Sequence, residues 1–84
     1  MKTIARNSEY IIKQVTKDAE KENAGYMFAV FTREEAKYGS LAYPEWQADS
    51  FQECLEGVAS SNARKFAFQV APEYRDAFDA WLQH

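Results

Sequence analysis

Four carboxylates in the second half of the chain have the spacing that an α-helix would gather on one side. They are Glu45, Asp49, Glu53 and Glu56. Residues three or four apart are neighbours on a helix, where like charges repel slightly. No Lys or Arg lies between Lys37 and Arg64 to neutralise them. The pattern predicts an acidic ridge that binds a basic protein surface. The alternative is an ordinary solvated helix face, in which first-turn acids favour the helix dipole.

Aromatic residues precede and enter this acidic stretch. Tyr38, Tyr43 and Trp46 surround a segment that contains Gly39 and Pro44. Tyr and Trp are enriched at the energetic centres of protein interfaces, because they bury a large area at low entropic cost. We therefore expect Tyr43 or Trp46 to be the apolar anchor of a protein-binding site beside the ridge. The alternative is that these rings fold back onto the core.

Candidates for catalysis are few. The chain has one cysteine, Cys54, and one histidine, His84, which is the last residue. One Cys and one His cannot supply a zinc site, and three scattered glycines cannot form a phosphate-binding loop. Cys54 adjoins the apolar Leu55 and is expected to be a buried, poorly reactive thiol. The sequence thus predicts no catalytic residues, no cofactor and no metal. A small enzyme or small-molecule binder that uses a carboxylate or Cys54 remains an alternative.

Composition limits the class of protein. The chain has 84 residues, of which 46% are hydrophobic and 15% aromatic, so we expect a single compact domain over residues 1–84. The net charge of −3 argues against direct binding to nucleic acid or an anionic membrane. No apolar run approaches the ~20 residues of a membrane span, and no signal peptide is evident. A lone cysteine favours a reducing, cytoplasmic location.

The last third of the chain has the clearest local pattern. Phe51, Leu55 and Val58 have helical spacing, and residues 64–71 alternate as in a half-buried strand. Pro72 then opens a second helix. Its apolar stripe comprises Tyr74, Ala77, Phe78, Trp81 and Leu82. We expect Phe78 and Trp81 to anchor the core.

The first half is more ambiguous. Residues 1–8 are expected to be a polar lead-in, and residues 9–16 a strand, with a helix over residues 8–23 as the alternative. Residues 26–32 form an apolar run typical of a central strand.

Three helix boundaries follow from capping signals. Thr32 with Glu35 predicts a short helical turn from Arg33 to Tyr38 that stops at Gly39. For the next helix, Pro44 predicts a start at residue 44 and Ser50 a start at residue 51, both ending at residue 61. Gly57, within that helix, indicates close packing or an early end.

These signals predict one α+β domain in the order strand, strand, helix, strand, helix. A small antiparallel sheet of about three strands packs on one face against the two C-terminal helices. The predicted function is that of a small non-catalytic protein-binding module, a regulator or inhibitor of a larger protein with a basic surface. A nucleic-acid mimic that occupies the basic groove of a nucleic-acid-handling protein is the main alternative.

Overall fold

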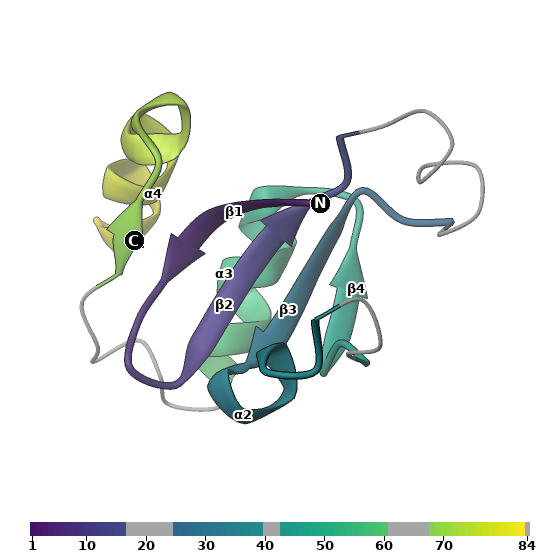
Figure 1. Cartoon of the computed structure of the whole chain (residues 1–84). Coiled ribbons are helices and arrows are strands. Elements are labelled where there is room, and N and C mark those ends of the chain that lie inside the picture. Colours follow the sequence, from purple (N-terminus) through teal and green to yellow (C-terminus); the bar gives the residue numbers. More distant parts are fainter. Residues whose placement is uncertain (17–24, 40–42, 61–67, 84) are drawn as a thin grey trace.

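The protein has two layers, an antiparallel sheet and a pair of helices packed against it (Figure 1). The computed structural model describes residues 1–16, 25–39, 43–60 and 68–83. The strands are β1 (Lys2–Arg6), β2 (Tyr10–Gln14), β3 (Phe28–Thr32), β4 (Trp46–Ala48) and β5 (Gln69–Val70). The helices are α2 (Arg33–Ala36), α3 (Phe51–Ser60) and α4 (Arg75–Leu82), the last preceded by a 3₁₀ turn, η3 (Pro72–Tyr74).

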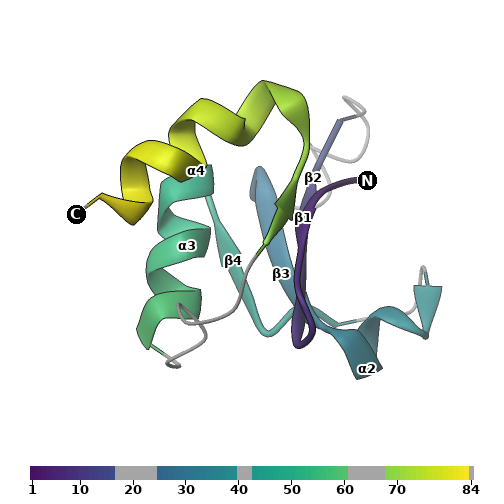
Figure 2. The same cartoon turned by 90° about the vertical axis from the view of Figure 1, so that its left-hand side faces the viewer.

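The predicted α+β class, the antiparallel sheet and the C-terminal helices are confirmed, but the sheet is larger than expected. Within the described residues it has five strands, in the order β4-β3-β2-β1-β5, rather than about three. Figure 2 shows α3 and α4 on the same side of the sheet, with α2 on the other side.

The prediction of a polar lead-in at residues 1–8 is wrong, because Lys2–Arg6 forms β1 between β2 and β5. The register of β1 against β2 shifts between Thr3 and Ala5. This irregularity leaves two consecutive residues, Ile4 and Ala5, buried in the core. Through its pairing with β5, β1 therefore places the first residues of the chain beside Gln69 and Val70.

Asn7 makes the turn between β1 and β2. Its side-chain Oδ1 accepts hydrogen bonds from the backbone N–H groups of Glu9 (2.8 Å) and Tyr10 (2.7 Å). Asn favours such turns because its short side chain can replace a backbone acceptor. In the helical alternative for residues 8–23 the same side chain would serve as an N-cap. The predicted strand over residues 9–16 is confirmed for Tyr10–Gln14. Residues 17–24, the rest of the alternative helix, lie outside the described residues.

The central strands β2 and β3 supply the middle of the core. Ile12 and Val30 are Cα partners in the register, and both are fully buried. On the opposite face of β3, Phe31 is also buried, and the Lys13 ammonium lies 5.2 Å from the centre of its ring. The unbroken apolar run at residues 26–32 is therefore explained by β3, which is buried on both faces.

Both capping-box spacings mark a helix start correctly. Thr32 and Glu35 form the full reciprocal box, whereas the Glu53 carboxylate accepts from the Asp49 backbone N–H. The Thr32 side chain accepts from the Glu35 backbone N–H, and α2 ends before Gly39, whose φ is 59°. Ser50 Oγ likewise accepts from the Glu53 N–H at 3.2 Å, and α3 starts at Phe51. A helix from Pro44 is therefore wrong, because residues 46–48 instead pair with β3 as the edge strand β4.

Aromatic rings join the C-terminal segment to both layers. The Tyr74 ring lies 6.1 Å from Phe28 of the sheet and 5.0 Å from Phe51 of α3, measured between ring centres. Phe78 contacts Phe68, at 5.8 Å, and Trp81, at 6.1 Å. Phe78 and Trp81 are buried, as predicted.

Two predictions for the C-terminal segment, the apolar stripe and the strand over residues 64–71, are not fully confirmed. Leu82, assigned to the apolar stripe, is the last residue of α4 and is 45% exposed. Of the predicted strand over residues 64–71, the part at residues 64–67 lies outside the described residues, and only Gln69–Val70 is strand in the rest.

Candidate functional site: the helix layer

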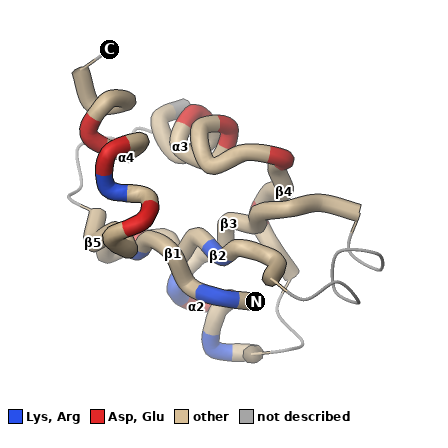
Figure 3. Tube along the Cα trace, turned by 90° about the horizontal axis from the view of Figure 1, so that it is seen from above, with Lys and Arg blue, Asp and Glu red and all other residues tan. Residues whose placement is uncertain are grey.

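Negative charge is concentrated on the helices. The helix layer, defined here as residues 49–60 and 71–83, carries one basic residue, Arg75, and six acidic ones. The acids are Asp49, Glu53, Glu56, Glu73, Asp76 and Asp79. The remaining described residues are nearly balanced, with five basic and four acidic side chains. Figure 3 shows this division, with red along α3 and α4 and most of the blue on the sheet and α2.

Only part of this charge is compensated. Arg75 pairs with Asp79 at 3.3 Å within α4, and Lys2 of β1 pairs with Glu73, which lowers the pKa of that carboxyl group. Over the described stretches, no ion pair involves the other four acids of the layer. All four are exposed. A cationic surface that approaches the helices would therefore meet exposed carboxylates.

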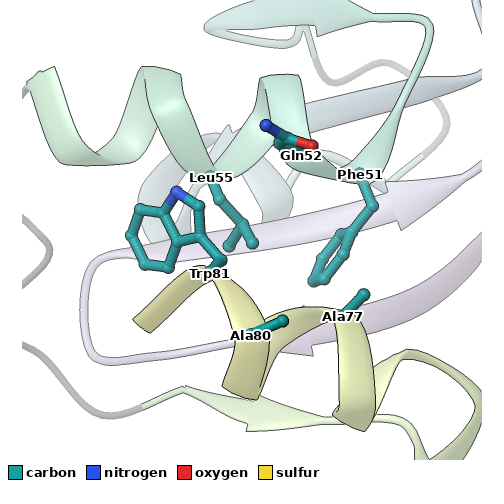
Figure 4. Close-up of a pocket in the computed structure, with 6 residues that line it drawn as sticks. All are labelled: Phe51, Gln52, Leu55, Ala77, Ala80 and Trp81. Carbon is teal, nitrogen blue, oxygen red and sulfur yellow. The ribbon is translucent and has the colours of Figure 1, made fainter. Parts of the chain in front are cut away.

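An apolar groove lies between α3 and α4 (Figure 4). Its volume is about 220 Å³, and it is lined by Phe51, Gln52, Leu55, Ala77, Ala80 and Trp81. The two helices are in contact with each other. Phe51, Leu55 and Trp81 are buried, whereas the other three lining residues are exposed. Sites for drug-sized ligands usually have ~300–1,000 Å³, so this groove suits an inserted side chain better than a cofactor.

Carboxylates stand on both sides of the groove. On α3, the Gln52 side-chain amide donates a hydrogen bond to the Glu56 carboxylate at 3.2 Å, which ties Glu56 to a lining residue. On α4, Asp76 precedes Ala77 and lies one turn before Ala80. Glu56 and Asp76 are called the rim acids below. The groove thus combines an apolar floor with negative charge at either side.

The predicted four-acid ridge does not form, because Glu45 is not on the helix. Its backbone N–H donates to the Val30 carbonyl at 2.7 Å, just before β4. Its side chain shares a hydrogen bond with Glu35 of α2, and this contact raises the pKa of Glu45. Asp49, Glu53 and Glu56 do lie together around the first turns of α3, where Glu53 also accepts from the Asp49 backbone N–H at 3.2 Å.

The predicted aromatic anchors separate in the structure. Trp46 is half-buried and packs against the core, with its ring centre 5.5 Å from that of Tyr10. For this residue the alternative was correct, since the ring folds back, and Trp46 is not an exposed anchor. Tyr43 and Tyr38 are 84% and 67% exposed. Tyr43 thus stays accessible, but it precedes the edge strand β4 and is not among the groove residues.

Sequence reasoning missed the groove itself. Gln52, Ala77, Ala80 and Asp76 were not predicted as site residues. One signal pointed to Ala77: the apolar stripe of the last helix spans five positions over nine residues, from Tyr74 to Leu82, more than a short helix needs to cover a sheet. Part of that stripe, Ala77 with one side of Trp81, faces α3 and the groove instead.

The remaining candidates for chemistry are Cys54 and possible metal ligands. Cys54 is fully buried, and burial raises the pKa of its thiol to about 12, so thiolate is scarce near neutral pH. No group of three or more His, Cys, Asp or Glu side chains is placed to hold a metal ion within the described ranges. No helix there is long and apolar enough to cross a membrane.

Comparison with protein-family models, with curated proteins and with solved structures found no match. The function is therefore inferred from the geometry and charge of the helix layer.

Proposed function

We propose that the protein is a non-catalytic binding module that docks its helix layer on the basic surface of a larger protein and so regulates or inhibits it. The observation that carries this proposal is the concentration of six acids and one base on one layer of the molecule. Such charge speeds encounter and selects the partner, while a buried apolar contact slows dissociation. The lone cysteine supports a reducing compartment such as the cytoplasm as the place of action.

The groove favours a protein partner over the mimicry of nucleic acid. A mimic replaces phosphates with carboxylates and needs no apolar depression between them. Here the rim acids flank an apolar floor formed by Phe51, Leu55 and Trp81. That combination of a desolvated centre and a polar edge is the usual anatomy of a protein–protein interface.

The test is an affinity capture from a lysate of the source cells with three tagged forms of the protein. They are the wild type, the double reversal Glu56→Lys/Asp76→Lys, and a matched control, Glu9→Lys/Glu34→Lys. All four positions are exposed, and Asp76 and Glu34 are both first-turn acids of their helices. Charge reversal at exposed sites should cost no more than ~1 kcal/mol each, so both variants should fold.

The wild type and the control should capture the same basic protein, and the helix-layer reversal at least tenfold less of it. Capture should also weaken as salt rises, because salt screens exposed charges. Equal capture by all three forms, or a captured partner with an acidic contact surface, would refute the proposal.

A further inference from the structure

We infer that the groove between α3 and α4 receives a basic amphipathic α-helix of the partner protein. One bulky apolar side chain of that helix enters over Phe51, Leu55 and Trp81, and flanking Lys or Arg residues pair with the rim acids. This inference rests on the proposed function and specifies which structure the partner presents.

The lining of the groove selects a helix over an extended peptide. Only Gln52 and the indole N–H of Trp81 are polar among the six lining residues, and the Gln52 amide N–H already donates to Glu56. The backbones on both sides belong to helices, whose N–H and C=O groups bond internally. An extended segment would bury backbone groups without partners, which is costly, whereas a helix satisfies its own backbone. Helix binding in an apolar groove is an established recognition mode.

The size of the groove and its small residues fit one inserted side chain. Ala77 and Ala80 have minimal side chains and are exposed, so a third helix can approach α4 closely there. Helices pack with axes 8–10 Å apart, at a distance set by the side chains at the contact. With about 220 Å³ available, the groove accommodates one large apolar residue and leaves its neighbours at the rim.

Charge excludes a second copy of this chain as the occupant. A symmetric pair would bring the same patch of each copy face to face. The rim acids Glu56 and Asp76 would then lie against another acidic helix layer, which holds six acids and one base. Like charges at close range disfavour that arrangement, whereas Lys and Arg on a partner helix relieve the repulsion.

The test selects ligands from a displayed library of helical peptides whose polar and apolar positions are both randomised, with the purified protein as bait. Enriched peptides should carry Lys or Arg around a bulky apolar residue repeated at helical spacing. Binding of the enriched peptides is then measured with Ala80→Leu, which fills the groove, and with Gln83→Leu. The second variant adds the same side chain to an exposed position that does not line the groove.

Ala80→Leu should weaken peptide binding at least tenfold, and Gln83→Leu should change it less than threefold. In the wild type, the backbone NMR signals of Leu55, Ala77 and Ala80 should shift on binding. Enrichment of acidic or extended peptides, no enrichment over bait-free support, or equal binding by both variants would overturn the inference. The proposed function would still stand if the rim-acid reversal abolished capture of the partner, and it would fall if that reversal had no effect.

Discussion

Trp46 and Gly57 lie in direct contact between the edge of the sheet and the helix layer. A β-carbon built on residue 57 would fall 2.5 Å from Nε1 of the Trp46 indole and 2.6 Å from its Cε2. Atoms do not approach so closely without displacement, so glycine is required for α3 to lie this near to β4. The glycine that interrupts the helical pattern in the sequence is therefore explained by close packing.

Gly57→Ala should lower stability despite the better helix propensity of alanine. Overpacking usually destabilises a protein by ~1–3 kcal/mol. Replacing glycine by alanine within a helix stabilises it by about 1 kcal/mol. We expect a net loss and a thermal midpoint lower by several degrees, since ~1 kcal/mol corresponds to about 4–8 °C in a domain of this size. Thermal unfolding followed by circular dichroism measures the shift.

A double-mutant cycle separates the two effects. In a Trp46→Val background the indole is gone, and Val suits a strand position. There Gly57→Ala should raise the midpoint, because only the gain in helix propensity remains. A decrease of the same size in both backgrounds would show that the indole is not what constrains residue 57.

The loss of stability on truncating an α4 side chain to alanine should depend strongly on its position. Phe78 is buried between Phe68 and Trp81, so Phe78→Ala should cost ~3–5 kcal/mol. Leu82 is 45% exposed on the same helix, and Leu82→Ala should change stability by less than ~0.5 kcal/mol. Urea unfolding of both variants checks the contrast. Similar losses at the two positions would mean that Leu82 packs more tightly than its exposure of 45% indicates.

Local signals predicted the elements that local residues determine. The capping boxes at Thr32 and Ser50 located the starts of α2 and α3, because a cap involves side chains within three residues. β1 and β4 escaped prediction for the opposite reason. β1 has few strand-formers and becomes a strand by pairing with β2 and β5. β4 becomes a strand by pairing with β3. β2 follows β1 closely, but β5 lies more than 60 residues away from β1 and β3 is separated from β4 by residues 33–45, so these pairings do not show in the local sequence.

The candidate site divides in the same way. The acidic spacing in the second half of the chain could be read from the sequence, and Asp49, Glu53 and Glu56 do lie on or just before α3. The position of Glu45 depended on where one helix began, so an error of a few residues moved it to another surface. The groove depends on how α3 and α4 pack together, which is a tertiary property that neither helix encodes alone.

Cys54 should resist modification in the folded protein and should make stability depend on alkaline pH. Burial raises the thiol pKa from 9.0 to about 12, so the folded form keeps the proton while the unfolded form loses it. The stabilising effect is complete below pH 9 and is lost as the pH rises toward 12. Urea unfolding at pH 8 and 10.5 should show a larger loss for the wild type than for Cys54→Ala, which controls for other titrating groups.

Labelling of Cys54 by a thiol reagent at pH 8 provides a second measurement. It should be far slower in native protein than in protein unfolded by urea, because the side chain is fully buried. Equal rates would show that the thiol is accessible and would contradict its place in the core.

Glu45 should take up its proton at a higher pH than Glu35, the carboxyl group with which it is paired. A hydrogen bond shared with Glu35, together with charge repulsion, raises the pKa of Glu45. Partial burial acts to raise the pKa of Glu35 too, but hydrogen bonds from the Thr32 backbone and hydroxyl outweigh it and lower that pKa. On acidification Glu45 should therefore take up its proton first, and NMR titration of the side-chain carboxyl carbons can follow both groups.

Glu35→Gln should bring the pKa of Glu45 back toward its ordinary value, since it removes the neighbouring charge. Gln also serves in a capping box, so α2 should keep its start. Glu34→Gln removes a charge of the same sign from the same helix and is the matched control; it should leave Glu45 nearly unchanged. If Glu35→Gln had no larger effect than Glu34→Gln, the pairing of Glu35 with Glu45 would be refuted. Glu45 would then rejoin the ordinary exposed carboxylates of the surface.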